Sequence, residues 1–146
     1  MLNSDFKEFV ELLNANAVEY LVVGGYALSA YGRPRYTGDI DFWVRPHPEN
    51  ARKVIKVLHN FGTASLGVKE QTFSEPNQIV QIGFEPRRID LLTSIDGVEF
   101  SDCYERRLQA IYSGVLMQFI GIEDFKRNKA AANRPKDKID IQDLEA

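Results

Sequence analysis

Residues 18–44 read VEYLVVGGYALSAYGRPRYTGDIDFWV, and this stretch decides the fold. Residues 18–23 are almost all apolar and β-prone, which predicts a strand buried on both faces. Gly24 and Gly25 end that strand, and residues 26–31 read as a short helix stopped by Gly32. Residues 39–44 then alternate polar and apolar side chains, which predicts a second strand with one face in the core.

The same periodicities extend through the rest of the chain. Ser4 is expected to cap the first helix, and residues 79–84 and 88–92 to form a hairpin. The further expected segments are helices at 4–14, 46–61, 123–132 and 135–145 and a last strand at 115–120. This order predicts one α/β domain of the α+β type over residues 1–146, with a central mixed sheet flanked by helices and closing C-terminal helices.

Composition narrows the function classes. The 146 residues are 44% apolar, enough for a core without disulfides or metal staples. The formal net charge of −3 argues against a nonspecific nucleic-acid binder, although a local basic patch stays open. Cys103 is the only cysteine, and no stretch approaches the roughly 20 apolar residues of a membrane span. We therefore expect a cytoplasmic protein with no disulfide and no membrane contact.

The Gly24-Gly25 turn has two interpretations. Glycines let a ligand approach the backbone, and a helix that starts directly afterwards offers unpaired N–H groups to a phosphate. An ordinary tight turn between a strand and a helix would have the same sequence.

Carboxylates supply the second feature. Asp39 and Asp41 lie two residues apart on a strand, so both point to one face with Cα atoms about 7 Å apart. Two such acids suit Mg²⁺, although two solvent-facing acids would look the same. Asp90 is a lone acid among strand-forming residues, and its cation would be either a metal or Arg88 two residues earlier.

Together these residues form a known combination. The pattern apolar-Gly-Gly, 13 residues, Asp-apolar-Asp-apolar, with a later Ile-Asp-Leu-Leu, resembles the DNA polymerase beta-like nucleotidyltransferase superfamily. Residues 35–41 (RYTGDID) and the tail at 125–140 are similar to small prokaryotic members, including abortive-infection-type nucleotidyltransferases. Many superfamily members have Gly-Ser at the turn; Gly25 removes that hydroxyl, so backbone amides must contact the phosphates.

The resemblance implies transfer of an NMP from an NTP such as ATP by two-metal catalysis with Mg²⁺, or alternatively Mn²⁺. Asp39, Asp41 and Asp90 are the implied catalytic residues and metal ligands. Gly24, Gly25, Thr37 and Lys129 are the implied nucleotide-binding residues, with a solvated surface lysine as the alternative for Lys129.

The acceptor is left open by the sequence: RNA, protein and a small molecule all remain. Alternative functions are a toxin–antitoxin component that modifies tRNA or protein, and a nucleotide-binding regulatory module with little turnover. The chain leaves little sequence for a separate acceptor-binding domain, so a homodimer or a helical partner protein is a further expectation.

Several other residues are expected to be structural. Arg134, Lys136, Asp137 and Asp140 should form an ion-paired helix start, whereas Arg33 and Arg35 could meet a triphosphate or remain solvated. His47 and His59 should be structural or exposed, and Trp43 and Tyr26 should pack in the core.

Overall fold

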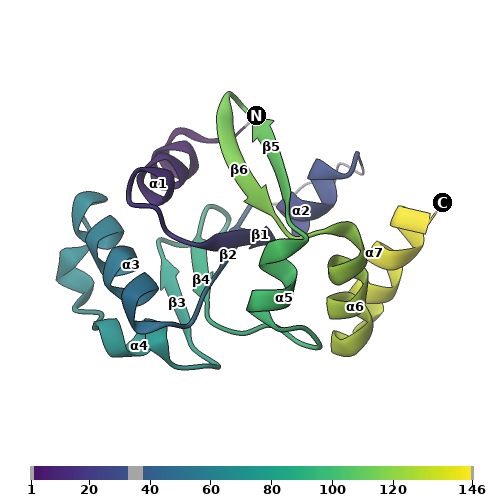
Figure 1. The fold of residues 1–146 in the computed structure, drawn as a ribbon. Helices are drawn as coiled ribbons and strands as arrows, with labels where there is room; N and C mark the ends of the chain where they lie inside the picture. Colours follow the sequence, from purple (N-terminus) through teal and green to yellow (C-terminus); the bar gives the residue numbers. More distant parts are fainter. Residues whose placement is uncertain (1, 33–37, 146) are drawn as a thin grey trace.

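The computed structural model describes residues 2–32 and 38–145. Within those two ranges the chain forms one six-stranded mixed sheet in the order β3-β4-β2-β1-β6-β5 (Figure 1). The strands are β1 (Tyr20–Val23), β2 (Ile40–Val44), β3 (Ile79–Ile82), β4 (Ile89–Leu92), β5 (Leu108–Tyr112) and β6 (Val115–Phe119). The helices are α1 (Ser4–Ala15), α2 (Gly25–Ala30), α3 (Pro48–Asn60), α4 (Glu70–Ser74), α5 (Phe100–Glu105), α6 (Ile122–Ala132) and α7 (Pro135–Glu145), with a 3₁₀ turn at Ala64–Leu66.

Helices cover both faces of the sheet. Helices α1 and α3 lie on one side and α5, α6 and α7 on the other (Figure 1). Phe42 of β2 packs toward α1, where its ring centroid is 5.5 Å from that of Phe9. Trp43 points to the opposite face and meets Phe100 of α5 edge-on at 5.1 Å. The alternation along β2 therefore directs Asp41 to the same face as Trp43.

Strand pairing brings the acidic motifs together. Strand β2 runs parallel to β4 with Asp41 opposite Asp90, and antiparallel to β1 with Asp41 opposite Val23. In-register neighbours share a face, so the carboxylates of Asp41 and Asp90 are adjacent. Gly24 follows directly after Val23, so the glycine turn lies next to Asp41 and its carboxylate.

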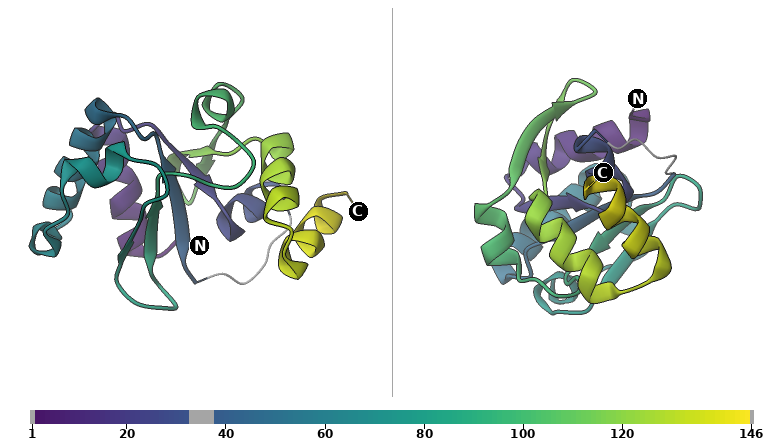
Figure 2. Two further views of the ribbon diagram at one scale, coloured as in Figure 1. Left: turned by 90° about the horizontal axis from the view of Figure 1, so that it is seen from below. Right: turned by 90° about the vertical axis from the view of Figure 1, so that its right-hand side faces the viewer.

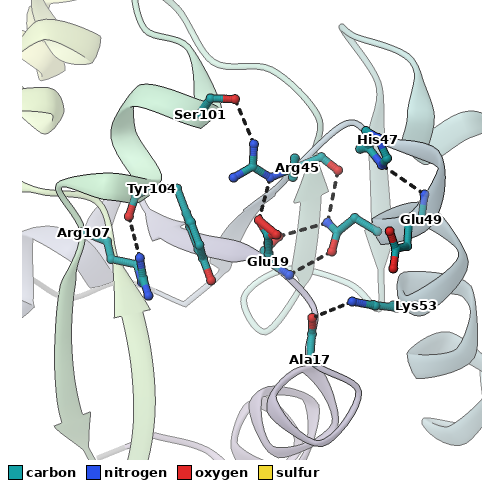
Figure 3. Close-up of polar contacts among 10 residues, drawn as sticks. Ala17, Glu19, Arg45, His47, Glu49, Lys53, Ser101, Tyr104 and Arg107 are labelled. Atoms are coloured by element: carbon teal, nitrogen blue, oxygen red, sulfur yellow. Dashed lines mark hydrogen bonds and ion pairs between the residues drawn. The ribbon is translucent and has the colours of Figure 1, made fainter.

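A polar network fixes the far end of β2, and Figure 3 shows it. Arg45 Nε donates to Glu19 Oε2 at 2.6 Å, and its Nη1 donates to Ser101 Oγ at 2.8 Å. Buried Asn50 donates to the carbonyls of Glu19 and Arg45 at 3.1 Å each, and its Oδ1 accepts from the Glu19 N–H at 2.8 Å. The strand that carries Asp41 is thereby tied to β1, α3 and α5.

Most expected elements and the overall class are confirmed, two helix starts are corrected, and three further elements are added. Asn3, not Ser4, caps α1, because Asn3 Oδ1 accepts from the Phe6 N–H at 2.8 Å. The helix expected from residue 46 begins at Pro48, because His47 is its cap and accepts from the Glu49 N–H. Helices α4 and α5 and strand β5 were not expected. Strand β5 is an edge strand with alternating half-exposed residues, and it pairs with β6 through a tight turn at Ser113 and Gly114.

Across the described residues, no helix combines the length and the apolar character needed to cross a membrane.

Candidate active site

The backbone of Gly24 lies directly beside the carboxylate of Asp41. Gly24 caps α2 with φ +70° and ψ −148°, a backbone conformation that residues other than glycine rarely adopt. A Cβ atom added at Gly24 would lie 2.5 Å from Asp41 Oδ2. The glycine expected from the sequence is therefore required twice, by its backbone angles and by the carboxylate beside it.

Asp41 and Asp90 share the centre of the cluster. Burial raises the pKa of Asp41 to about 6, and the neighbouring carboxylate of Asp90 and a hydrogen bond with it add to this increase. Lys129 lowers the pKa of Asp41 and Asp39 raises it slightly. At Asp41, burial and the neighbouring carboxylates therefore outweigh the positive charge of Lys129, which is the electrostatic condition that favours binding of a further cation.

Among the residues that the structure describes, Arg88 contacts both of the other two acids. Its Nε and Nη2 atoms donate to Asp90 Oδ1 and Oδ2 at 2.6 and 3.1 Å. Nη2 also lies 3.4 Å from Asp39 Oδ2, and the Arg88 backbone N–H donates to Asp39 Oδ1 at 2.9 Å. The ion pair considered for Asp90 in the sequence is therefore present.

The three acids provide only oxygen donors, the chemistry that Mg²⁺ and Mn²⁺ prefer. As placed, however, no group of three or more His, Cys, Asp or Glu residues in the described ranges is arranged to hold an ion. The donor set fits a divalent cation, whereas its present geometry is that of an arginine-paired cluster.

A cavity of about 420 Å³ opens beside Asp41. Three of the residues singled out from the sequence line it: Gly24, Asp41 and Lys129. The full lining is Val23, Gly24, Asp41, Ile79, Leu92, Ser94, Ile95, Asp96, Asn128, Lys129, Ala132 and Arg134. Asp39, Asp90 and Gly25 are not among these described lining residues, and Thr37, Arg33 and Arg35 fall outside the part of the chain that the structure describes.

Lys129 differs from the solvated-lysine interpretation. It is only 6% exposed, and its Nζ lies 3.3 Å from Asp137 Oδ1 and 3.8 Å from Asp140 Oδ2. Helices α6 and α7 lie side by side, as Figure 2 shows, and this contact joins them. Arg134 pairs with both oxygens of Asp137 at 2.7 and 3.0 Å, which confirms these two members of the expected ion-paired start of α7, whereas Asp140 pairs with Lys129 of α6 and Lys136 is exposed. Hydrogen bonds from Arg134, outweighing burial, lower the pKa of Asp137 to about 2.

Several cavity residues carry no signal in the sequence that marks them as part of a site. Ser94 and Asp96 follow β4 in an irregular loop, and Asn128 donates to the Asp96 carbonyl at 2.9 Å. A second cavity of about 430 Å³ shares Ser94 and Ile95 with the first and reaches Trp43. The two cavities are therefore neighbours along the strand face that carries Asp41.

Four of the residues that were expected to be structural or exposed lie as expected. Trp43 and Tyr26 are buried, His47 caps α3, and His59 is exposed in its last turn.

Two solved structures share this architecture. The lincosamide antibiotic adenylyltransferase LnuA, solved with lincomycin bound, aligns over 100% of this chain and 98% of its own, with 14% identity and a TM-score of 0.58. A Thermotoga maritima protein assigned to the nucleotidyltransferases aligns over 92% of this chain and 86% of its own, with 14% identity and a TM-score of 0.62. At this identity the likeness concerns the fold, which is that of nucleotidyltransferases.

The family follows from the sequence itself. Residues 2–145 match the model of the nucleotidyltransferases of unknown function, DUF6036, and the chain belongs to that family. No curated protein matches the sequence.

Proposed function

We propose that this protein transfers a nucleotidyl group from an NTP to a small hydroxylated molecule, with a divalent cation bound by Asp39, Asp41 and Asp90. The observation that carries the proposal is the shared cavity of Gly24, Asp41 and Lys129, which adjoins the Asp41/Asp90 pair. It unites a close backbone approach, a carboxylate and a buried ammonium group, the parts that a triphosphate site needs.

Each residue has a distinct role in this proposal. The bound cation, Mg²⁺ or Mn²⁺, would neutralise charge on the phosphates. Asp41 and Asp90 would hold it from the adjacent strands β2 and β4, and Asp39 from the position just before β2. Gly24 would let the phosphates approach the backbone, with Gly25 beside it and Thr37 as a further nucleotide contact. Lys129 would face the phosphates from α6, fixed in place by its contact with Asp137.

A small acceptor is favoured by two observations. The cavity that adjoins the proposed nucleotide site measures about 430 Å³, within the range of small-molecule pockets. LnuA, described as an adenylyltransferase of lincosamide antibiotics, is matched over 98% of its length, so a chain of this size suffices for a small acceptor. A homodimer or a helical partner would complete the open side of the site, and the cytoplasm would supply the NTP.

Transfer from α-³²P-labelled ATP, GTP, CTP and UTP tests the proposal. The protein is incubated with Mg²⁺ or Mn²⁺ and with separated small-molecule, RNA and protein fractions of a lysate. Asp39→Ala/Asp41→Ala should abolish labelling, and the exposed Asp5→Ala is the matched control.

The outcomes separate the alternatives. Label in the small-molecule fraction supports the proposal. Label confined to tRNA or protein overturns the small acceptor and supports a toxin–antitoxin role. Metal-dependent NTP binding without transfer to any fraction supports a regulatory module, and absence of such binding overturns the enzyme.

A further inference from the structure

The guanidinium of Arg88 bridges the acids that the proposed function assigns to the metal. Besides its contacts with Asp90 and Asp39, its Nη1 donates to Glu85 Oε1 at 3.1 Å. The Arg88 side chain is only 21% exposed, so these carboxylates meet a partly desolvated charge rather than a solvated surface arginine.

The oxygens that a metal would use are engaged. Both carboxylate oxygens of Asp90 accept from the guanidinium. One oxygen of Asp39 accepts from the Arg88 backbone N–H, and the other lies near Nη2. A divalent ion on the same oxygens would sit within a few ångströms of a fixed positive charge, and the two cations would repel each other strongly.

We propose that Arg88 is a built-in counterion of Asp39 and Asp90 and that its guanidinium is displaced when a divalent cation binds these acids. This inference rests on the proposed function, because it takes Asp39 and Asp90 to be metal ligands. It accounts for a donor set that suits Mg²⁺ but is not arranged to hold an ion: the arginine keeps the acids in an arginine-binding geometry.

Glu85 offers the displaced guanidinium another partner. It lies in the turn between β3 and β4, its side chain is 72% exposed, and it already contacts Nη1. Arg88 can exchange Asp90 for Glu85 by side-chain rotation, without movement of β4. The backbone hydrogen bond from Arg88 to Asp39 does not depend on the guanidinium and can persist in both states.

Calorimetric titration of the full chain with Mn²⁺ alone tests the inference. We expect Arg88→Ala to bind Mn²⁺ about tenfold more tightly than wild type, because the ion then no longer meets the repulsion of a fixed positive charge at the Asp39 and Asp90 oxygens. Arg87→Ala is the matched control, an exposed arginine one residue earlier, and should bind as wild type does.

Thermal melting supplies an independent readout. In EDTA, Arg88→Ala should melt below wild type because Asp90, Asp39 and Glu85 each lose an ion pair with the guanidinium. With saturating Mn²⁺, its melting temperature should rise by more than that of wild type. Should Arg88→Ala fail to fold in both conditions, Arg88→Gln keeps the length of the side chain without its charge and replaces it in both assays.

Weaker or unchanged Mn²⁺ binding by Arg88→Ala overturns the inference and makes Arg88 a fixed structural partner of Asp90. If wild type binds Mn²⁺ and only the gain is missing, the proposed function stands without the counterion. If neither protein binds Mn²⁺, the metal-dependent function fails together with the inference.

Discussion

Replacing Gly24 with alanine tests whether the glycine turn is shaped by the carboxylate behind it. Two costs add at this position. The φ of +70° with ψ −148° is nearly exclusive to glycine, and such backbone strain costs about 1–3 kcal/mol. The new Cβ would also lie 2.5 Å from Asp41 Oδ2, so either the turn or the carboxylate must move.

Gly67→Ala is a control for a positive φ without a clash; its ψ of 22° is in the ordinary left-handed region, where the backbone cost of alanine is smaller than at Gly24. Gly67 has a φ of +68°, but a Cβ there would meet no atom within 4 Å. It should therefore lose only the roughly 1 kcal/mol of a left-handed alanine. We expect Gly24→Ala to lose about 3 kcal/mol, which corresponds to a fall in melting temperature of roughly 10 °C for a chain of this size.

Urea and thermal unfolding of the two variants, of Asp41→Ala and of Gly24→Ala/Asp41→Ala measure the coupling. The double variant should recover about 1 kcal/mol relative to the sum of its parts, because the oxygen that the Cβ meets is gone. Equal losses in Gly24→Ala and Gly67→Ala, or strict additivity in the cycle, would refute the contact.

Three further predictions concern ionisable groups. In EDTA, Asp41→Asn should raise the free energy of unfolding by about 1–2 kcal/mol above pH 6 and have little effect near pH 4, because the raised pKa of Asp41 makes its ionised form unfavourable in the fold. Asp39→Asn is the control and should lower the free energy of unfolding, because it loses its ion pair with Arg88. A loss of stability in both variants would contradict the argument. Because the pKa of Asp137 is lowered, its contribution to the free energy of unfolding is complete above pH 4 and is lost as the pH falls toward about 2. In urea unfolding, Asp137→Asn should therefore lose about 1 kcal/mol less stability than wild type between pH 4 and pH 2. An equal loss in the two proteins would contradict this prediction. Cys103 is buried and burial raises its pKa to about 12, so a thiol reagent at pH 8 should label it only at the rate of unfolding; rapid labelling of the native protein would contradict its placement.

The local pattern of the sequence was sufficient for the central part of the fold. The alternation of residues 39–44 put Asp39 and Asp41 on one face, and the two-residue spacing of Arg88 and Asp90 allowed for their ion pair. Both are short-range relations that a strand fixes by its own geometry. Assignment of Asp39, Asp41 and Asp90 to a metal remains a prediction.

Contacts between distant elements were harder to foresee. Lys129 is buried because α7 folds back along α6 and brings Asp137 to it, and nothing in the local sequence distinguishes this lysine from a solvated one. Strand β5 was missed because it gains its order from pairing with β6, not from a strong apolar pattern of its own. Ser94 and Asp96 reach the cavity from an irregular loop that carries no periodicity.

The link between Lys129 and α7 has a consequence for the tail of the chain. Residues 135–145 supply the carboxylates that make a buried ammonium group tolerable in the cavity wall. Trimming by a carboxypeptidase past Asp137 would therefore expel or neutralise that lysine and deform the cavity while the sheet stayed folded. Conversely, a ligand that steadies Lys129 in the cavity wall would slow digestion of α7, so the protection of α7 would report occupancy beside Asp41.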